Sequence, residues 1–154
     1  MSVSFSERET PLGKQLKKQL EEMAKLSVNV GFQAGDAAED SGIDVVDIAA
    51  WNEFGNERIP ARPFMRDSFD NNKDTITKLL QSEGQKITDG TTTAEQVLTK
   101  VGMAMKGLIQ NEIREGTFKP LKKATIERKG SSKPLIDTGT MRQSVNYVVK
   151  PKEG

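Results

Sequence analysis

Three arginines at intervals of four residues form the clearest group of chemically active side chains in this sequence. Arg58, Arg62 and Arg66 lie in a segment that also contains Pro60 and Pro63. A guanidinium group forms paired hydrogen bonds with a phosphate or a carboxylate, so these side chains could bind DNA or acidic residues of a neighbouring protein. Acidic residues flank the segment and favour a protein interface. An exposed face with local salt bridges, each of small energy, is the simpler alternative.

A second group of basic residues follows Gly116. We interpret its members as candidate contacts with DNA or a protein partner: Lys119, Lys122, Lys123, Arg128 and Lys129. Lysine contacts with phosphate give weak, salt-sensitive binding without sequence preference, and a net charge of +1 gives the whole chain no attraction to nucleic acid. Every charged residue from Asp36 to Glu57 is acidic. The acidic middle and the basic end could therefore form complementary edges between copies.

Asp137-Thr138-Gly139 has the composition of an aspartic protease motif, in which two such carboxylates share one proton. The polar run Met141-Arg142-Gln143-Ser144 follows it, whereas an apolar strand would follow the protease motif. A helix cap at Asp137 explains the same residues more simply. We therefore expect no catalytic residue and no enzymatic activity.

Other kinds of active site are excluded by the residues that the sequence lacks. The chain has no histidine and no cysteine, so disulfide bonds, the common zinc sites and the cysteine–histidine or serine–histidine–aspartate catalytic groups cannot form. An EF-hand calcium loop centred on Gly42 would place Ala37 at its first ligand position. The glycine patterns of phosphate-binding and dinucleotide-binding loops are also missing. We expect no cofactor and no metal.

The arginines belong to a stretch, Val45 to Arg66, around which we expect the chain to be organised. Its first part has apolar residues at helical spacing, with Asp44 or Asp47 at the start and Gly55 at the end of the predicted helix. Pro60 and Pro63 make the next residues stiff and extended, and Pro63 suits the first position of another helix. Trp51, Phe54 and Phe64 lie either in a buried corner or on a contact surface.

The remaining pattern predicts helices and two strands. Expected helices span 11–26, 63–83 with Gly84 as the stop, 92–116 with a capping box at Thr92 and Glu95, 121–129, and a short turn that begins near Asp137. Alternating apolar residues predict strands at 27–33 and 145–149, which could pair. Within the helix at 92–116, Gly102 and Gly107 are either simply tolerated, which is the simpler interpretation, or allow close approach of another helix or another subunit.

These elements predict an α+β fold: a small, mostly antiparallel sheet packed against three or four helices, two of them long. With 154 residues the chain should form one domain. We expect a flexible N-terminus at 1–10, the domain at 11–149 with mobile loops near 34–43 and 117–134, and a flexible tail at 150–154. No apolar run has the length needed to cross a bilayer.

Two motifs resemble a known family. Asn52-Glu53-Phe54-Gly55, followed by Ile59-Pro60-Ala61-Arg62-Pro63-Phe64-Met65-Arg66, is similar to the signature of phage tail-completion proteins, the virion morphogenesis proteins (minor tail and neck proteins) of tailed phages and prophages. Pro134-Leu135-Ile136-Asp137-Thr138-Gly139-Thr140-Met141-Arg142-Gln143-Ser144 resembles the stretch that often precedes the last strand in that family. The order and separation of the two motifs also fit.

The resemblance implies a structural virion protein that completes the tail or the head–tail neck. Its implied partners are copies of itself in an oligomeric ring and phage tail-tube, tail-terminator or head–tail connector proteins, with incidental contact with genome DNA and none with a membrane. It implies a location in the virion, and in the bacterial host cytoplasm during assembly. The expected interface residues are Trp51, Glu53, Phe54, Arg58, Ile59, Pro60, Arg62, Pro63, Phe64, Arg66, Asp137, Thr138, Thr140 and Arg142. The alternative function is a nucleic-acid-binding module that uses the basic C-terminal segment.

Overall fold

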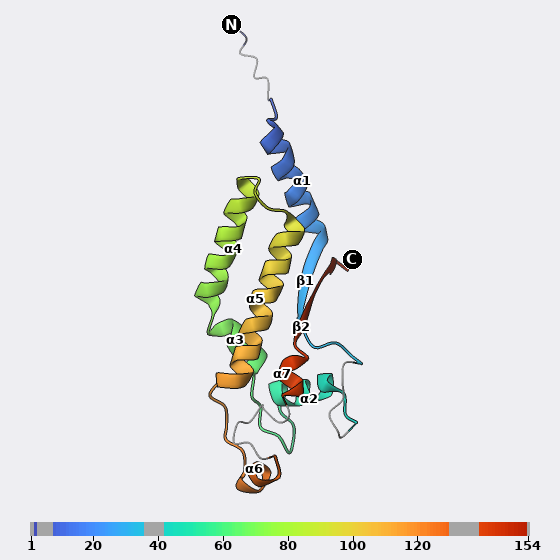
Figure 1. The fold of residues 1–154 in the computed structure, drawn as a ribbon, viewed down its shortest axis with the longest axis vertical. Coiled ribbons are helices and arrows are strands. Elements are labelled where there is room, and N and C mark those ends of the chain that lie inside the picture. The colour runs from blue at the N-terminus through green and yellow to red at the C-terminus, as the bar shows by residue number, and fades with distance from the viewer. Residues whose placement is uncertain (1, 3–7, 36–41, 130–138, 154) are drawn as a thin grey trace.

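The computed structural model describes residues 2, 8–35, 42–129 and 139–153. Within these ranges the elements follow the order α1 (Pro11–Lys25), β1 (Leu26–Gly31), α2 (Val45–Phe54), α3 (Phe64–Asp70), α4 (Lys73–Thr88), α5 (Ala94–Glu115), α6 (Lys123–Lys129), α7 (Thr140–Gln143) and β2 (Asn146–Pro151). The molecule is elongated (Figure 1): α1 extends from one end, α6 lies at the other, and α5 runs between them beside the sheet. The predicted α+β class is confirmed. The expectation of three or four helices was too low, because several short helices connect the long ones.

Helix α5 begins with a capping box one residue later than the sequence pattern indicated. The hydroxyl of Thr93 accepts a hydrogen bond from the backbone N–H of Gln96, and the Gln96 side chain accepts one from the backbone N–H of Thr93, both at 3.2 Å. The expected pair, Thr92 and Glu95, has the same spacing. Glutamine serves as well as glutamate in this motif, so the sequence allows a capping box at either of two neighbouring positions.

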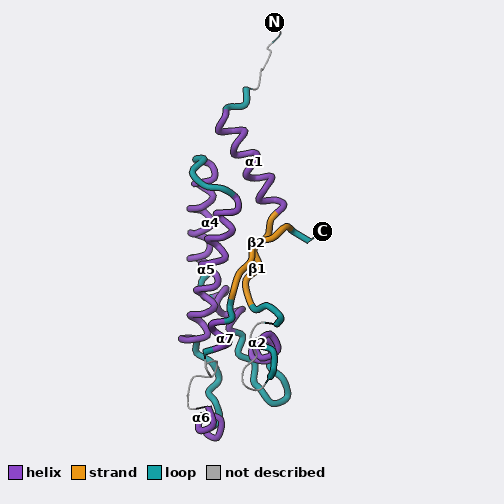
Figure 2. The backbone as a smooth tube through the Cα atoms, turned by 45° about the vertical axis from the view of Figure 1, so that its right-hand side comes forward, coloured by secondary structure: helices purple, strands orange, loops and turns teal. Residues whose placement is uncertain are grey.

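Strands β1 and β2 form the antiparallel pair that the sequence predicted, with Val28 opposite Val149 and Val30 opposite Tyr147. Figure 2 shows the two strands side by side along α5. Gly102 of α5 makes this contact possible, because a Cβ atom there would lie 2.5 Å from Cδ2 of Tyr147. Gly102 therefore allows close approach, but of the sheet and not of the helix or subunit that the sequence suggested, whereas Gly107 has open space where its Cβ would be. Strand β2 also includes Lys150 and Pro151, which were expected in the tail.

The prediction of a single helix over 63–83 is wrong, because α3 and α4 are separate. The chain leaves helical geometry at Asn72, whose side-chain amide donates to the carbonyl of Ser68 at 2.8 Å. Asparagine favours such local bonds to the backbone over a continuing helix. Gly84 does not end α4 either. The helix continues to Thr88 and stops at Gly90, whose φ of +73° is readily adopted only by glycine.

The main core lies at the end of α5 nearest to α2. Its buried apolar residues come from α2, α3, α5 and α7 and from the position just before β2: Val45, Ala49, Phe64, Ile109, Ile113, Met141 and Val145. A smaller group packs at the other end of α5, around Ile87, Ala94 and Val97. The sheet is only half covered, since no residue of either strand is fully buried.

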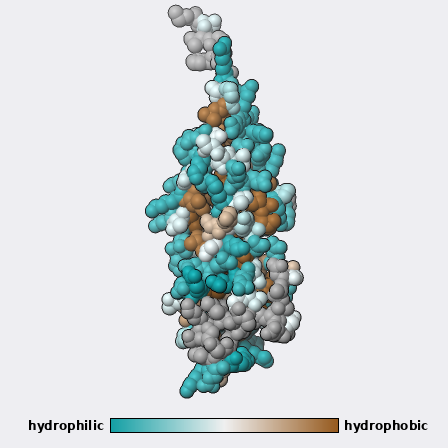
Figure 3. Space-filling view, in the orientation of Figure 1, coloured by the Kyte–Doolittle hydropathy of each residue, from teal (hydrophilic) through white to brown (hydrophobic). Residues whose placement is uncertain are grey.

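Helix α1 differs most from its expected packing. Gln19 fixes it to α5, because its side-chain oxygen accepts the backbone N–H of Ala94 at 2.7 Å. The apolar residues at helical spacing that predicted this helix, Leu12, Leu16, Leu20 and Met23, are not buried, however: Leu12 is 48% exposed and Leu20 is 53% exposed. Figure 3 shows apolar patches over α1 and over the middle of the molecule, surrounded by hydrophilic surface. No helix in the described ranges is long and apolar enough to span a membrane.

Candidate protein-interaction site

The stretch from Asp44 to Arg66 folds into a corner that is fixed by its own polar groups. The Asp44 carboxylate caps α2 by accepting the N–H of Val46 at 2.9 Å and also accepts the N–H of Gly35. These two bonds lower the pKa of Asp44, because they favour the charged form. At the other end of α2, Gly55 has φ +74°, and a Cβ there would lie 2.7 Å from the nitrogen of Ala61. Only glycine fits this position.

A short turn then reverses the chain against α2. The side-chain oxygen of Asn56 accepts the N–H groups of Arg58 and Ile59, both at 2.8 Å. The carbonyl of Asn52 accepts the N–H of Arg62 at 2.6 Å. Backbone and side-chain bonds together hold residues 55–62 in one conformation, so the corner is rigid without a partner.

Glu53 is used inside the corner. Its side chain is 8% exposed, and its two carboxylate oxygens accept the N–H of Met65 at 2.9 Å and the N–H of Arg66 at 3.2 Å. These N–H groups have no partner within α3 because they lie in its first turn, where a negative charge is favourable. Glu53 therefore joins α2 to α3. The sequence gives no local signal for this bond, because the partners are 12 and 13 residues apart.

The three arginines do not act as a group. Arg62 is 5% exposed, and its Nε donates to the carbonyl of Lys119 at 3.1 Å, which joins the corner to the segment after α5. Burial lowers the pKa of Arg62. Arg58 and Arg66 are exposed. The interval of four would align them only on one continuous helix, and here they lie in a turn, an extended segment and a helix.

The aromatic residues of the corner divide into core and surface. Phe64 is fully buried and packs edge-on against Phe32, with ring centroids 6.0 Å apart. Trp51 is 39% exposed and Phe54 is 72% exposed. Ile59 and Pro63 are half-buried, and Pro60 is exposed. Large exposed aromatic side chains on a rigid element are typical of protein interfaces.

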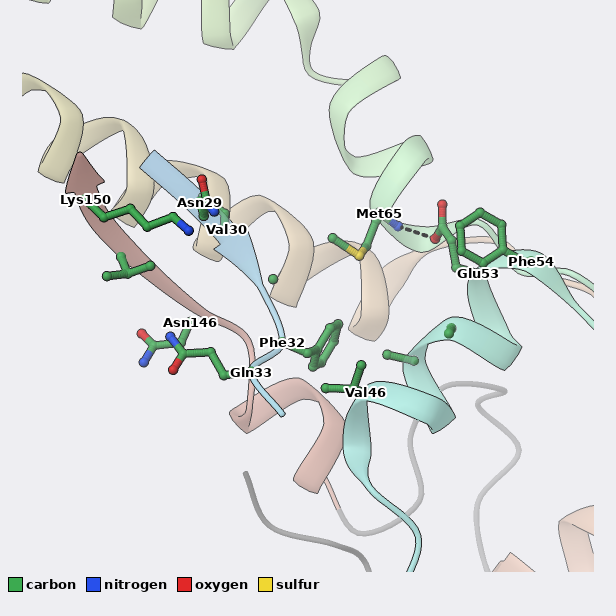
Figure 4. Close-up of a pocket in the computed structure, with 14 residues that line it drawn as sticks. Asn29, Val30, Phe32, Gln33, Val46, Glu53, Phe54, Met65, Asn146 and Lys150 are labelled. Atoms are coloured by element: carbon green, nitrogen blue, oxygen red, sulfur yellow. Dashed lines mark hydrogen bonds between the residues drawn. The ribbon is translucent and has the colours of Figure 1, made fainter. Parts of the chain in front are cut away.

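Phe54 borders an open groove of about 870 Å³ between α2 and the sheet. Its lining comes from β1 and the residues after it, α2, Met65 and β2: Asn29, Val30, Gly31, Phe32, Gln33, Val46, Ala49, Ala50, Glu53, Phe54, Met65, Asn146, Val148 and Lys150. Figure 4 shows Phe32, Val46 and Met65 at its α2 end, and Asn29 and Lys150 on the strands. The sequence pattern predicted an apolar face on this helix but not the groove beside it.

The second sequence motif is described only from Gly139 onward. Asp137 and Thr138, and with them the predicted cap, lie outside the described residues. Thr140 begins α7 and is half-buried. Arg142 is also half-buried, and its carbonyl accepts the side-chain amide of Gln110 at 3.1 Å. This part of the motif fixes α7 against α5.

The basic segment forms the end of the molecule opposite α1. Lys119, Lys122, Lys123 and Arg128 are exposed, and the predicted short helix is present as α6, with Lys129 as its last residue. Asp36, Glu39 and Asp40 of the proposed acidic edge lie outside the described ranges.

The described part of the chain contains no cluster of three or more acidic residues that could hold a metal ion. Comparison with protein-family models, with curated proteins and with solved structures finds no match to this chain. The candidate site is therefore defined by its own geometry: a rigid corner with exposed aromatics beside an apolar groove.

Proposed function

We propose that this protein is a structural component of a tailed phage or prophage particle, which completes the tail or the head–tail neck by binding copies of itself and neighbouring virion proteins. The observation that carries the proposal is the exposed pair Trp51 and Phe54 on a corner that is already rigid. A rigid corner loses little conformational entropy on binding, so its apolar surface contributes fully to affinity.

The other residues of the motif stabilise the corner from within and do not form its contact surface. Glu53, Arg62 and Phe64 hold the corner together, and Phe64 has no exposed surface to offer a partner. The proposed contact surface therefore narrows to Trp51, Phe54, Arg58, Pro60 and Arg66, whose side chains are all exposed.

A sedimentation experiment tests this proposal. Purified protein is mixed with tail-tube or portal particles that lack a completion protein, and the bound fraction is measured. Phe54→Glu should lower the apparent affinity at least about tenfold, because truncating a central aromatic contact commonly costs more than about 1.4 kcal/mol. Leu80→Glu is the matched control, since Leu80 is 49% exposed on α4, away from the corner. Failure of the wild-type protein to bind either particle would contradict the proposal.

A nucleic-acid-binding module remains the second candidate, favoured by the exposed lysines around α6. Fluorescence titration with duplex DNA at about 50 and 200 mM salt separates the two functions. Tight binding with a steep loss of affinity at the higher salt would favour DNA. Weak binding at both concentrations favours the protein-contact role.

A further inference from the structure

Helix α1 carries an apolar stripe that its own molecule leaves uncovered. Leu16, Leu20 and Ala24 recur at intervals of four and line a shallow hollow together with Gly13. Leu20 is 53% exposed, and Ala24 is exposed as well. This stripe lies beside, not on, the face that holds α1 to the body through Gln19. It is therefore available to another surface.

Among the described residues, the groove beside α2 is another open apolar surface. Val46, Ala50 and Phe54 line one wall of it at intervals of four residues, and Val148 comes from the strand side. An amphipathic helix is the usual occupant of such a groove, with anchor residues three or four positions apart. The stripe on α1 has this spacing.

The two helices carry opposite net charges, and each surface also includes one side chain of the other sign: Glu21 beside the stripe and Lys150 on the strand side of the groove. Helix α1 has four lysines and two glutamates, whereas α2 with its cap has three carboxylates and no basic residue. Lys17 lies beside the stripe, where it makes a 3.9 Å contact with Glu9. Asp47 is exposed, three and seven residues before Ala50 and Phe54. Charge complementarity of this kind selects the partner and its orientation.

Helix α1 cannot fill the groove of its own molecule. It continues directly into β1 and points away from α2, toward the opposite end of the elongated fold (Figure 1). A neighbouring copy has no such restriction. The donor and the acceptor surfaces differ, so the contact is head-to-tail, and repetition of such a contact produces a ring or an open filament.

We propose that α1 of one copy binds in the groove between α2 and the sheet of the next copy, with Leu16, Leu20 and Ala24 as anchors and Lys17 near Asp47. This inference deepens the proposed function, on which it rests, by naming the contact that joins like copies.

Site-specific cross-linking tests the contact, since the natural chain has no cysteine. One variant carries Leu20→Cys and another carries Phe54→Cys; both positions are exposed, so the fold should be retained. The two are mixed at rising concentration under mild oxidation. We expect the mixed disulfide dimer to exceed both self-dimers several-fold. The matched control replaces Leu20→Cys with Leu80→Cys, at a position of similar exposure.

Each outcome decides the proposal. The proposal is supported if the yield of mixed dimer exceeds that of the Leu80→Cys control. The yield should also fall when the donor carries Lys17→Glu, and recover when the acceptor carries Asp47→Lys as well. A yield equal to the control, or dominant self-dimers of the Leu20→Cys variant, would overturn it. The two proposals fail in different ways. If the protein binds the particles but the cross-link does not form, only the helix-in-groove contact is rejected. If the cross-link forms but the protein does not bind the particles, only the virion role is rejected.

Discussion

Single polar residues in the corner act mainly within the chain. Asn52, Glu53, Asn56 and Arg62 each bond to backbone groups of the corner or of the segment after α5. Of these residues, Glu53 and Arg62 were predicted to lie at an interface, because charged side chains are common at the surface. Sequence could not separate the two roles, since burial depends on residues that are distant along the chain.

Glu53→Gln should reduce the free energy of unfolding by about 1–3 kcal/mol, because the amide of this buried side chain would place a donor against an N–H group at the start of α3. Chemical denaturation followed by circular dichroism measures the change. Glu57→Gln is the control, since Glu57 is exposed in the same corner and its replacement should have almost no effect. Equal losses for the two variants would argue against the Glu53 bonds.

Gly102→Ala and Gly107→Ala should have opposite effects on stability. A Cβ at Gly102 would overlap Tyr147 and Val28, at 2.5 and 2.9 Å, so we expect a loss of about 1–3 kcal/mol from overpacking. At Gly107 the space is open, and alanine should increase stability by up to about 1 kcal/mol through its helix propensity. Thermal unfolding of both variants checks the pair. Stabilisation by both substitutions would show that the sheet can move away from α5.

At the scale of elements, sequence periodicity located the long helices and both strands well. Capping threonines, alternating valines and Gly55 gave local signals that tertiary contacts then reinforced. The division of 63–83 into α3 and α4 was missed, because asparagine is also tolerated within helices and its local bond to Ser68 is visible only in the fold. The stripe on α1 correctly predicted a helix, but periodicity alone does not reveal which apolar face is covered.

Glu83 forms one ion pair within α4, with Lys86, and one with Lys100 of α5, and these pairs should make the stability of the fold pH-dependent. Glu83 is 3% exposed and lies 2.5 Å from Nζ of Lys86 and 3.0 Å from Nζ of Lys100. Hydrogen bonds from these lysines, that from Lys86 first, hold the pKa of Glu83 below its ordinary value of 4.5. The folded state therefore binds a proton less readily than the unfolded state, and the ionised carboxylate contributes stability above that value.

Replacement of Glu83 should reveal this dependence. At neutral pH, Glu83→Gln should be less stable than the natural chain. As the pH falls below about 4.5 and through the lowered pKa of Glu83, the natural chain loses this advantage and the difference should shrink. Urea denaturation from neutral to acidic pH measures it. A difference that stays constant over this range would assign the effect of the substitution to packing instead of charge.

At the scale of the whole molecule, the α+β class and the pairing of β1 with β2 followed from the sequence. The groove did not, because β1, α2, α3 and β2 contribute to it from positions that are far apart in the chain. The elongated shape was also not predicted. It places α1 and the groove where they cannot meet within one copy, so the proposed contact requires a second copy.

Hydrogen–deuterium exchange of the protein, free and bound to tail-tube or portal particles, tests the central claim most directly. If the corner is the recognition surface, backbone amides at 45–66 should exchange more slowly in the bound state, while those of α4 should change little. Protection confined to 119–129, or a bound state with no protection at 45–66, would contradict a recognition role for Trp51 and Phe54.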